Sequence, residues 1–222
     1  LERLCLVAPA RFPASEANVM AAGADDVLFN ARVCADVREA VADCGLVVGT
    51  TSRSRRTAWR LAEPREAASE IAIEARRADV AVVFGAERSG LTNDELRQCQ
   101  LLVTIPTSSD YASLNLAMAV QLMAYEILLA SRDQPPVMPR DAPLATSNEI
   151  ELLYEHLEKV LDEIEFHDRT GSGHLMTRLR RLFNRAVLDQ NEANILRGIL
   201  TAVQRGRRPA GRRPASSADG PR

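Results

Sequence analysis

Residues 80–95, VAVVFGAERSGLTNDE, decide the fold class. The fully apolar run at Val80–Phe84 predicts a strand buried on both faces, as in a parallel sheet. Two glycines follow it, and this residue type permits a positive φ or a close approach of backbone to a ligand. Thr92 and Glu95 then have the spacing of a capping box, which predicts that a helix begins there. The segment therefore predicts a strand, a loop of small residues and a helix.

The same alternation continues along the chain in both directions. Apolar strands are predicted at 4–8, 27–29, 46–50, 80–84 and 101–105, and helices at 14–22, 33–44, 64–75 and 114–129. Short strands that alternate with helices predict an α/β fold whose parallel sheet is covered on both faces. Ligands of such sheets bind beyond the carboxyl ends of the strands.

The composition is that of an ordinary globular protein. The 222 residues are 46% hydrophobic and carry a formal net charge of −2. No stretch approaches the roughly 20 apolar residues of a membrane span, and no signal-peptide pattern opens the sequence. We therefore expect a cytoplasmic protein that does not contact a membrane. The cysteines are far apart and away from the histidines, which predicts buried reduced thiols and no metal site; they are Cys5, Cys34, Cys44 and Cys99.

The pattern changes after residue 132, where we expect a first domain over 1–132 to end. Proline and polar residues predict a linker at 133–147, and apolar residues at helical spacing predict a helical extension over 148–204. Residues 205–222 hold several arginines among Gly, Pro, Ala and Ser, and such a segment predicts a disordered basic tail. The tail fits contact with nucleic-acid phosphates or a merely solvated terminus.

Three loops that follow predicted strands are rich in small or polar residues, at 49–52, 85–95 and 105–115. Each alone also fits an ordinary turn. Glu87 fits a surface acid or a partner of Arg88, and Ser113 fits a helix cap. Asn115 opens an otherwise apolar helix, where a buried amide would need partners. Residue chemistry alone predicts an α/β domain with a small-molecule site.

Residues 83–92 resemble the second signature motif of the SPOUT superfamily of RNA 2'-O-methyltransferases, which are TrmH/SpoU-like. Residues 111–120, YASLNLAMAV, followed by Tyr125–Glu126, resemble the third. The loop at 49–55 and the helical segments at 179–183 and 194–200 resemble the TrmJ-type tRNA methyltransferases of that superfamily. The resemblance spans residues 1 to 204.

The resemblance implies a parallel-sheet SPOUT fold with a trefoil knot, a homodimer and S-adenosyl-L-methionine as cofactor. It implies 2'-O-methylation of tRNA at pyrimidine 32 of the anticodon loop, either cytidine or uridine. No metal is needed, since the sulfonium is already an activated methyl donor. The residues that match the cofactor contacts, mostly through backbone groups, are Thr50, Thr51, Ser52, Gly85, Ile105, Ser113 and Leu114. The residues that match the polar active site are Glu87, Ser113 and Asn115.

The sequence departs from the family pattern in two places. An arginine of the family's first motif lies upstream of the strand that opens this chain, so we expect the full protein to supply it with one further strand and helix. If Leu1 is the true start, we expect only cofactor or RNA binding to survive. Ala86 stands where relatives commonly carry arginine, which is expected to weaken one RNA contact.

Three other functions fit the sequence. The first is 2'-O-methylation of another tRNA or rRNA site, since the second and third motifs barely distinguish these enzymes. The second is a catalytically impaired RNA-binding relative. The third is an α/β nucleotide-binding protein unrelated to RNA, which would show no thermal shift with S-adenosylmethionine.

Overall fold

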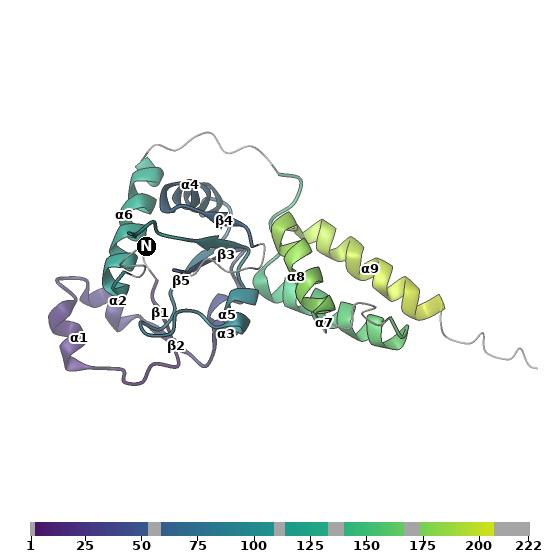
Figure 1. Cartoon of the computed structure of the whole chain (residues 1–222), viewed down its shortest axis with the longest axis horizontal. Coiled ribbons are helices and arrows are strands. Elements are labelled where there is room, and N and C mark those ends of the chain that lie inside the picture. Colours follow the sequence, from purple (N-terminus) through teal and green to yellow (C-terminus); the bar gives the residue numbers. More distant parts are fainter. Residues whose placement is uncertain (1–2, 53–58, 109–113, 133–139, 167–173, 207–222) are drawn as a thin grey trace, which may run out of the picture.

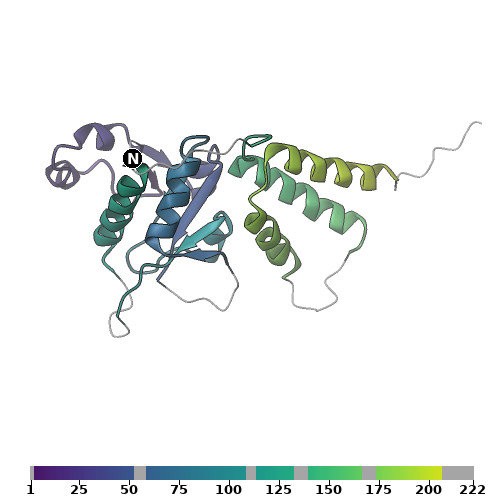
Figure 2. The ribbon, with the colours of Figure 1, turned by 90° about the horizontal axis from the view of Figure 1, so that it is seen from above.

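A computed structural model describes residues 3–52, 59–108, 114–132, 140–166 and 174–206. The chain forms an α/β part followed by three helices that project from one side of it (Figures 1 and 2). The strands are β1 (Cys5–Val7), β2 (Arg32–Cys34), β3 (Leu46–Thr50), β4 (Leu61–Ala62), β5 (Val80–Val83) and β6 (Leu101–Val103). The helices are α1 (Ser15–Met20), α2 (Asp25–Phe29), α3 (Val37–Val41), α4 (Pro64–Glu74), α5 (Asn93–Arg97), α6 (Leu116–Arg132), α7 (Ser147–Glu163), α8 (Leu175–Ala186) and α9 (Gln190–Gly206).

The main sheet is parallel, with the strand order β4-β6-β3-β5, and β1 and β2 form a second parallel pair. Successive side chains of a strand point to opposite faces. Leu46 and Val48 of β3 therefore pack against α4 and α6, whereas Val47 packs against α3 and α5. Helices thus cover both faces of the sheet, and the predicted α/β fold with parallel strands is confirmed.

The predicted strand at 27–29 is wrong, because these residues end the helix α2. Asp25 and Asp26 occupy the first turn of that helix, where negative charge is favourable. Phe29 is 90% exposed, so the apolar run that suggested a strand is not part of the core. The strand in this region is β2, which pairs with β1 by placing Val33 beside Leu6.

The helix predicted from Val33 begins only at Val37, since two acidic side chains cap it there. Asp36 Oδ1 accepts a hydrogen bond from the Glu39 N–H at 2.8 Å. Glu39 Oε2 accepts one from the Ala35 N–H at 2.7 Å. The pattern of an acid followed three residues later by Glu was visible in the sequence and marks the true helix start.

The helices α7, α8 and α9 share a hydrophobic core of their own, centred on Leu153 and Tyr154. The second half of the segment predicted as a linker is packed rather than free. Leu144 and Ala145 are buried, and the Ser147 N–H donates to the Cys44 carbonyl at 2.8 Å. The entry to α7 is therefore fixed to the α/β part.

One buried side chain of α8, Asn184, joins the helical part to the α/β part. It is 4% exposed, and its Nδ2 donates to the carbonyls of Arg97 and Cys99, both at 3.2 Å. Its Oδ1 accepts from the Tyr154 hydroxyl at 2.5 Å. Burial raises the pKa of Tyr154, so this hydroxyl is a donor at every physiological pH. Arg180 lies over the Tyr154 ring, 4.4 Å from its centroid. The junction is thus built from satisfied polar groups.

Replacing Asn184 by leucine is expected to destabilise the protein by about 3 kcal/mol, because each buried polar group left without a partner costs roughly 1–3 kcal/mol. The free energy of unfolding from urea titration measures the loss. Asn194→Leu is the matched control, since Asn194 is exposed on α9. Equal unfolding free energies for the two variants would contradict the role given to Asn184.

The four cysteines are free thiols. Cys34 and Cys99 are buried as predicted, but Cys5 is exposed, so the prediction of buried thiols is wrong for that residue. Burial raises the pKa of Cys99 to about 12 and that of Cys44 to about 11. In the described part of the chain, no helix is long and apolar enough to cross a membrane. Within the same residues, no group of three His, Cys, Asp or Glu side chains could hold a metal ion.

Candidate active site

The parallel register brings the carboxyl ends of three strands to one edge of the sheet. Gly49 of β3 lies beside Val83 of β5, and Thr50 lies beside Val103 of β6. The chain segments after Thr50, Val83 and Val103 therefore leave the sheet at the same place. This is the edge at which parallel α/β sheets bind ligands.

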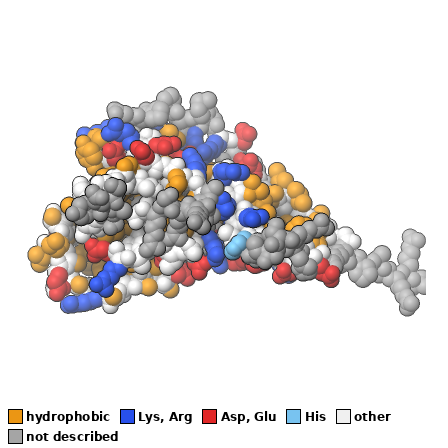
Figure 3. Space-filling model, viewed as in Figure 1, with side chains coloured by type: hydrophobic (Ala, Val, Ile, Leu, Met, Phe, Trp, Pro, Cys, Tyr) orange, Lys and Arg blue, Asp and Glu red, His pale blue; other side chains and the backbone are white. Residues whose placement is uncertain are grey.

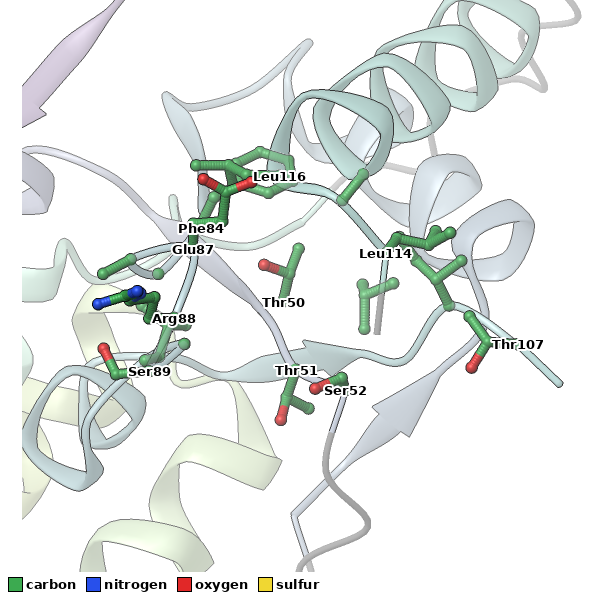
Figure 4. Close-up of a pocket in the computed structure, with 17 residues that line it drawn as sticks. Thr50, Thr51, Ser52, Phe84, Glu87, Arg88, Ser89, Thr107, Leu114 and Leu116 are labelled. Atoms are coloured by element: carbon green, nitrogen blue, oxygen red, sulfur yellow. The ribbon is translucent and has the colours of Figure 1, made fainter. Parts of the chain in front are cut away.

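A cavity of about 390 Å³ lies at this edge, between the three segments (Figure 4). Its volume falls in the range of small-molecule sites, roughly 300–1,000 Å³. Arg88 and Ser89 lie at one end of it and Thr107 and Leu114 at the other (Figure 4). The structure brings six of the seven residues predicted to contact a cofactor to this cavity: Thr50, Thr51, Ser52, Gly85, Ile105 and Leu114. The seventh, Ser113, lies outside the described residues.

The loop after β5 folds tightly on itself. The Gly90 N–H donates to the Ala86 carbonyl at 2.7 Å, and Gly90 has a φ of +67°, which favours glycine. A Cβ on Gly85 would lie 2.1 Å from the carbonyl carbon of Gly90 and 2.2 Å from the Leu91 nitrogen. Only glycine therefore fits at position 85, and the reason is contact with the loop's own backbone.

The predicted capping box at the end of this loop is confirmed. Thr92 Oγ1 accepts from the Glu95 N–H at 3.3 Å, and Glu95 Oε2 accepts from the Thr92 N–H at 2.6 Å. These bonds fix the start of α5 and so the second end of the loop. The cavity wall at residues 85–91 is held at both ends, by β5 and by α5.

Gly49, in contrast, belongs to the strand β3 and packs in the core. A Cβ there would lie 2.7 Å from Cys99 Sγ and 3.0 Å from Leu102 Cδ2. The loop predicted to start at Gly49 therefore starts after Thr50.

The two threonines at the end of β3 use part of their polar groups to hold the sheet together. Thr50 Oγ1 donates to the Val83 carbonyl at 3.2 Å. The Thr51 N–H donates to the Val103 carbonyl at 2.9 Å. The Thr51 N–H is not available to a ligand in the cavity, because it already has a partner. Such a ligand can bond only to the other polar groups of Thr50 and Thr51.

Asn115 links the loop after β5 to the helix α6. Its Nδ2 donates to Glu87 Oε1 at 2.8 Å, and its Oδ1 accepts from the Ala117 N–H at 2.9 Å. Asn115 is exposed, so the expectation of a buried amide is wrong, but both polar atoms of the amide have partners. The predicted alternative for Glu87, a pair with Arg88, is not found among the described contacts. Two of the three predicted catalytic residues are thus in direct contact at the cavity.

Several cavity residues were not predicted as site residues: Phe84, Arg88, Ser89, Gly90, Leu91, Val103, Thr107, Leu116 and Ala119. Four of them lie inside the loops that are rich in small or polar residues, so their place in the sequence could have identified them: Arg88, Ser89, Gly90 and Thr107. The apolar members look like ordinary core residues in the sequence. The lining thus combines apolar side chains with hydroxyl groups and backbone, which suits a ligand with both apolar and polar parts.

Two family models match the sequence. The SpoU rRNA methylase family matches residues 1–125, and the C-terminal domain of the tRNA methyltransferase TrmJ matches residues 148–214. A relative from Yersinia enterocolitica, tRNA (cytidine/uridine-2'-O-)-methyltransferase TrmJ, is 47% identical over 92% of this chain and 82% of its own. The TrmJ of Sodalis glossinidius is 44% identical over 94% of this chain and 83% of its own.

The fold is also similar to that of solved methylase structures. The crystal structure of TrmJ from Z. mobilis ZM4 superposes with a TM-score of 0.77 at 35% identity, over 92% of this chain and 88% of that one. A putative methylase family protein from Neisseria gonorrhoeae gives a TM-score of 0.63 at 34% identity, over 71% of this chain and 82% of that one.

Proposed function

Because the chain belongs to the SpoU methylase family and to its TrmJ branch of tRNA methyltransferases, we propose that it methylates a ribose 2'-hydroxyl of tRNA. The nucleotide is a cytidine or uridine, at position 32 of the anticodon loop, and the reaction takes place in the cytoplasm. The structural observation that carries the proposal is the single cavity formed by three strand-end loops, with the contact between Glu87 and Asn115 beside it.

S-adenosyl-L-methionine is the proposed cofactor, and the residues at the cavity suit it. Apolar side chains such as Ile105 and Leu114 would cover the adenine, while backbone groups around Gly85 and the hydroxyl of Ser52 would hold the polar parts. When bound, this molecule supplies a methyl group already activated by the sulfonium. The protein's own task is then to position the ribose and to remove its proton.

Glu87 and Asn115 are proposed to hold the ribose in line with the methyl donor. Holding the hydroxyl within attack distance lowers the activation free energy by several kcal/mol, and a base that removes its proton lowers it further. Asn115 presents its amide from a fixed helix start, since Oδ1 is tied to Ala117. Ser113, which lies outside the described residues, joins this pair in the proposal by its place in the sequence motif. An arginine of the family's first motif, which would face the substrate, completes the proposed active site.

The segment that carries this arginine is proposed to add a strand against β5. This strand is outermost in the main sheet among the described residues, and all four of its apolar residues, Val80–Val83, are only partly buried. Leu46–Val48 of β3, in the sheet interior, are fully buried. An apolar strand with an uncovered edge favours pairing with another strand.

A trefoil knot is also part of the proposal. β6 is the last strand of the main sheet in the sequence, yet it lies inside the sheet between β4 and β3. The chain must therefore pass between two strands formed by earlier residues before it reaches α6. That path is what the threading of a knot requires.

The decisive experiment uses the full-length protein with S-adenosylmethionine and tRNA transcripts. We expect 2'-O-methylation at pyrimidine 32, detected by mapping of ribose methylation, and its absence from tRNA of a strain that lacks the gene. Methylation at a different tRNA or rRNA nucleotide would favour the first alternative. Cofactor binding without methyl transfer would favour an impaired RNA-binding relative.

A homodimer through α6 completes the proposal. Met118 and Tyr125 are 64% and 54% exposed and lie seven residues apart, so they share one face of α6. The same helix lines the cavity with Leu116 and Ala119. A second copy that covers this apolar face would also close one side of the cavity.

Replacing Met118 and Tyr125 by aspartate is expected to convert the dimer to a monomer, because each copy would bring two charges into an apolar interface. Sedimentation equilibrium measures the mass. Ile195→Asp/Ile199→Asp on α9 is the matched control, since these two apolar side chains are 62% and 55% exposed and lie on a different helix. A double variant of α6 that keeps the mass of the wild type would exclude this helix as the interface.

A further inference from the structure

The short helix α5 connects the cavity to the helical part of the chain. It follows the loop at 85–91, which forms one wall of the cavity, and it packs against α8 (Figure 1). α5 has five residues, whereas an isolated helix needs about 12–15 residues to be even marginally stable in water. The position of α5 therefore depends on what holds its two ends.

The two ends of α5 are held in different ways. At the N-terminal end, Thr92 and Glu95 form the capping box within the sequence of the helix itself. At the C-terminal end, the last carbonyls of a helix have no partner inside it. Here Asn184 of α8 supplies the partner, since its Nδ2 donates to the carbonyls of Arg97 and Cys99, both at 3.2 Å. A side chain of α8 thus caps the C-terminal end of α5.

Leu91 couples the position of α5 to the cavity. It is 4% exposed, packs in one cluster with Leu96 and Cys99, and also lines the cavity. From the side of the sheet, a Cβ placed on Gly49 would lie 3.1 Å from Leu91 Cδ1, so the leucine is closely packed there as well. Close-packed interiors transmit displacements. A shift of α5 therefore also shifts Leu91 and the wall of the cavity.

The bonds of Asn184 are shielded from water. Basic side chains gather on the surface where α8 meets the α/β part (Figure 3), whereas Asn184 itself is 4% exposed. Its Oδ1 accepts from the Tyr154 hydroxyl at 2.5 Å, and this hydroxyl also lies 3.2 Å from the Arg180 carbonyl. Hydrogen bonds are stronger in such surroundings than in water. The amide of Asn184 is thus oriented by Tyr154 on one side and holds α5 on the other.

We propose that Asn184 is a positioning residue for the cofactor: by capping α5 from α8, it holds the loop at 85–91 in the form that binds S-adenosyl-L-methionine. This inference rests on the proposed function. Without the cap, α5 and the loop open for part of the time, and the apparent dissociation constant rises in inverse proportion to the fraction of molecules whose loop is closed. The helical part then contributes to the cofactor site without touching the cofactor.

The test compares Asn184→Ala with Tyr154→Phe in the full-length protein. Each removes polar atoms from the same buried network, but only the first removes the donor to α5. Asn184→Ala is expected to bind S-adenosyl-L-methionine roughly 10-fold more weakly, equivalent to about 1.4 kcal/mol, and Tyr154→Phe within about twofold of the wild type. Calorimetry measures both affinities. The KM for the cofactor should rise in Asn184→Ala, while kcat at saturating cofactor should equal that of the wild type.

Amide hydrogen exchange gives a second measurement, which needs no ligand. Peptides that cover residues 85–99 should exchange faster in Asn184→Ala than in Tyr154→Phe, because loss of the cap increases local opening. Asn184→Ser retains a hydroxyl that can donate one bond. It should therefore lie between alanine and wild type in both measurements, and it replaces the alanine variant if that variant does not fold.

The outcomes separate this inference from the proposed function. Equal cofactor affinities of Asn184→Ala and Tyr154→Phe overturn the inference, whatever their exchange rates. A wild-type protein that binds no S-adenosyl-L-methionine overturns the proposed cofactor instead. In that case the exchange rates still test whether Asn184 holds the loop, and equal rates in the two variants overturn that role.

Discussion

Replacing Gly85 by alanine is expected to lower the affinity for S-adenosylmethionine by about 100-fold or more, since forcing an overlap of this kind costs about 3 kcal/mol. The added Cβ would lie 2.1 Å from the Gly90 carbonyl carbon and 2.2 Å from the Leu91 nitrogen. Both of these are backbone atoms, and they cannot rotate away as a side chain can. The loop must open, and the cavity wall that it forms moves with it.

Calorimetry with S-adenosylmethionine or S-adenosylhomocysteine measures this effect. The matched control is Gly198→Ala on α9, where an added Cβ meets nothing within 4 Å. That control should bind the cofactor normally and gain roughly 0.5–1 kcal/mol of stability from helix propensity. Normal binding by the Gly85 variant would refute the assignment of this loop to the cofactor.

Replacing Asn115 by alanine is expected to reduce kcat by about 100-fold, while cofactor affinity stays within about threefold, because positioning of the reacting group accounts for effects of this size. The amide lies beside the cavity rather than in its lining, and it connects Glu87 to the start of α6. Loss of the amide frees Glu87 without filling or emptying the cavity. Single-turnover kinetics with saturating cofactor measures the rate of methyl transfer.

A second pair of variants separates the capping role of Asn115 from its contact with Glu87. Asn115→Ser keeps a side-chain oxygen for the Ala117 N–H but has no amide to donate to Glu87. Glu87→Gln keeps a carbonyl oxygen that accepts from Asn115 and removes the negative charge. If Asn115→Ser turns over like the wild type, Asn115 serves only as a helix cap and the catalytic proposal for it fails.

The interior of the α/β part could be predicted because its strands are continuous apolar runs. Val80–Phe84 and Leu46–Gly49 have no polar side chain on either face, which occurs where helices cover both sides of a sheet. The capping box at Thr92 could also be predicted, since its two side chains bond to backbone groups only three residues away. Both features depend on residues close in sequence.

The errors arose where distant residues decide the structure. Residues 27–29 are apolar enough for a strand, but pairing with β1 is available only to residues 32–34. β4 has two residues, too few for any pattern, and exists because β6 lies beside it. The contact between Glu87 and Asn115 joins side chains 28 positions apart. Asn184 gave no signal at all, since an asparagine in a helix is usually solvated.

The interior place of β6 has a consequence for how the chain folds during synthesis. β3 and β4 leave the ribosome before β6, yet neither bonds to the other in the finished sheet. Leu61 and Ala62 can form β4 only after residues 101–103 have paired with β3. The N-terminal half therefore cannot reach its final form as an independent unit, and an intermediate on the ribosome that ends before Leu101 leaves one edge of β3 without its partner strand.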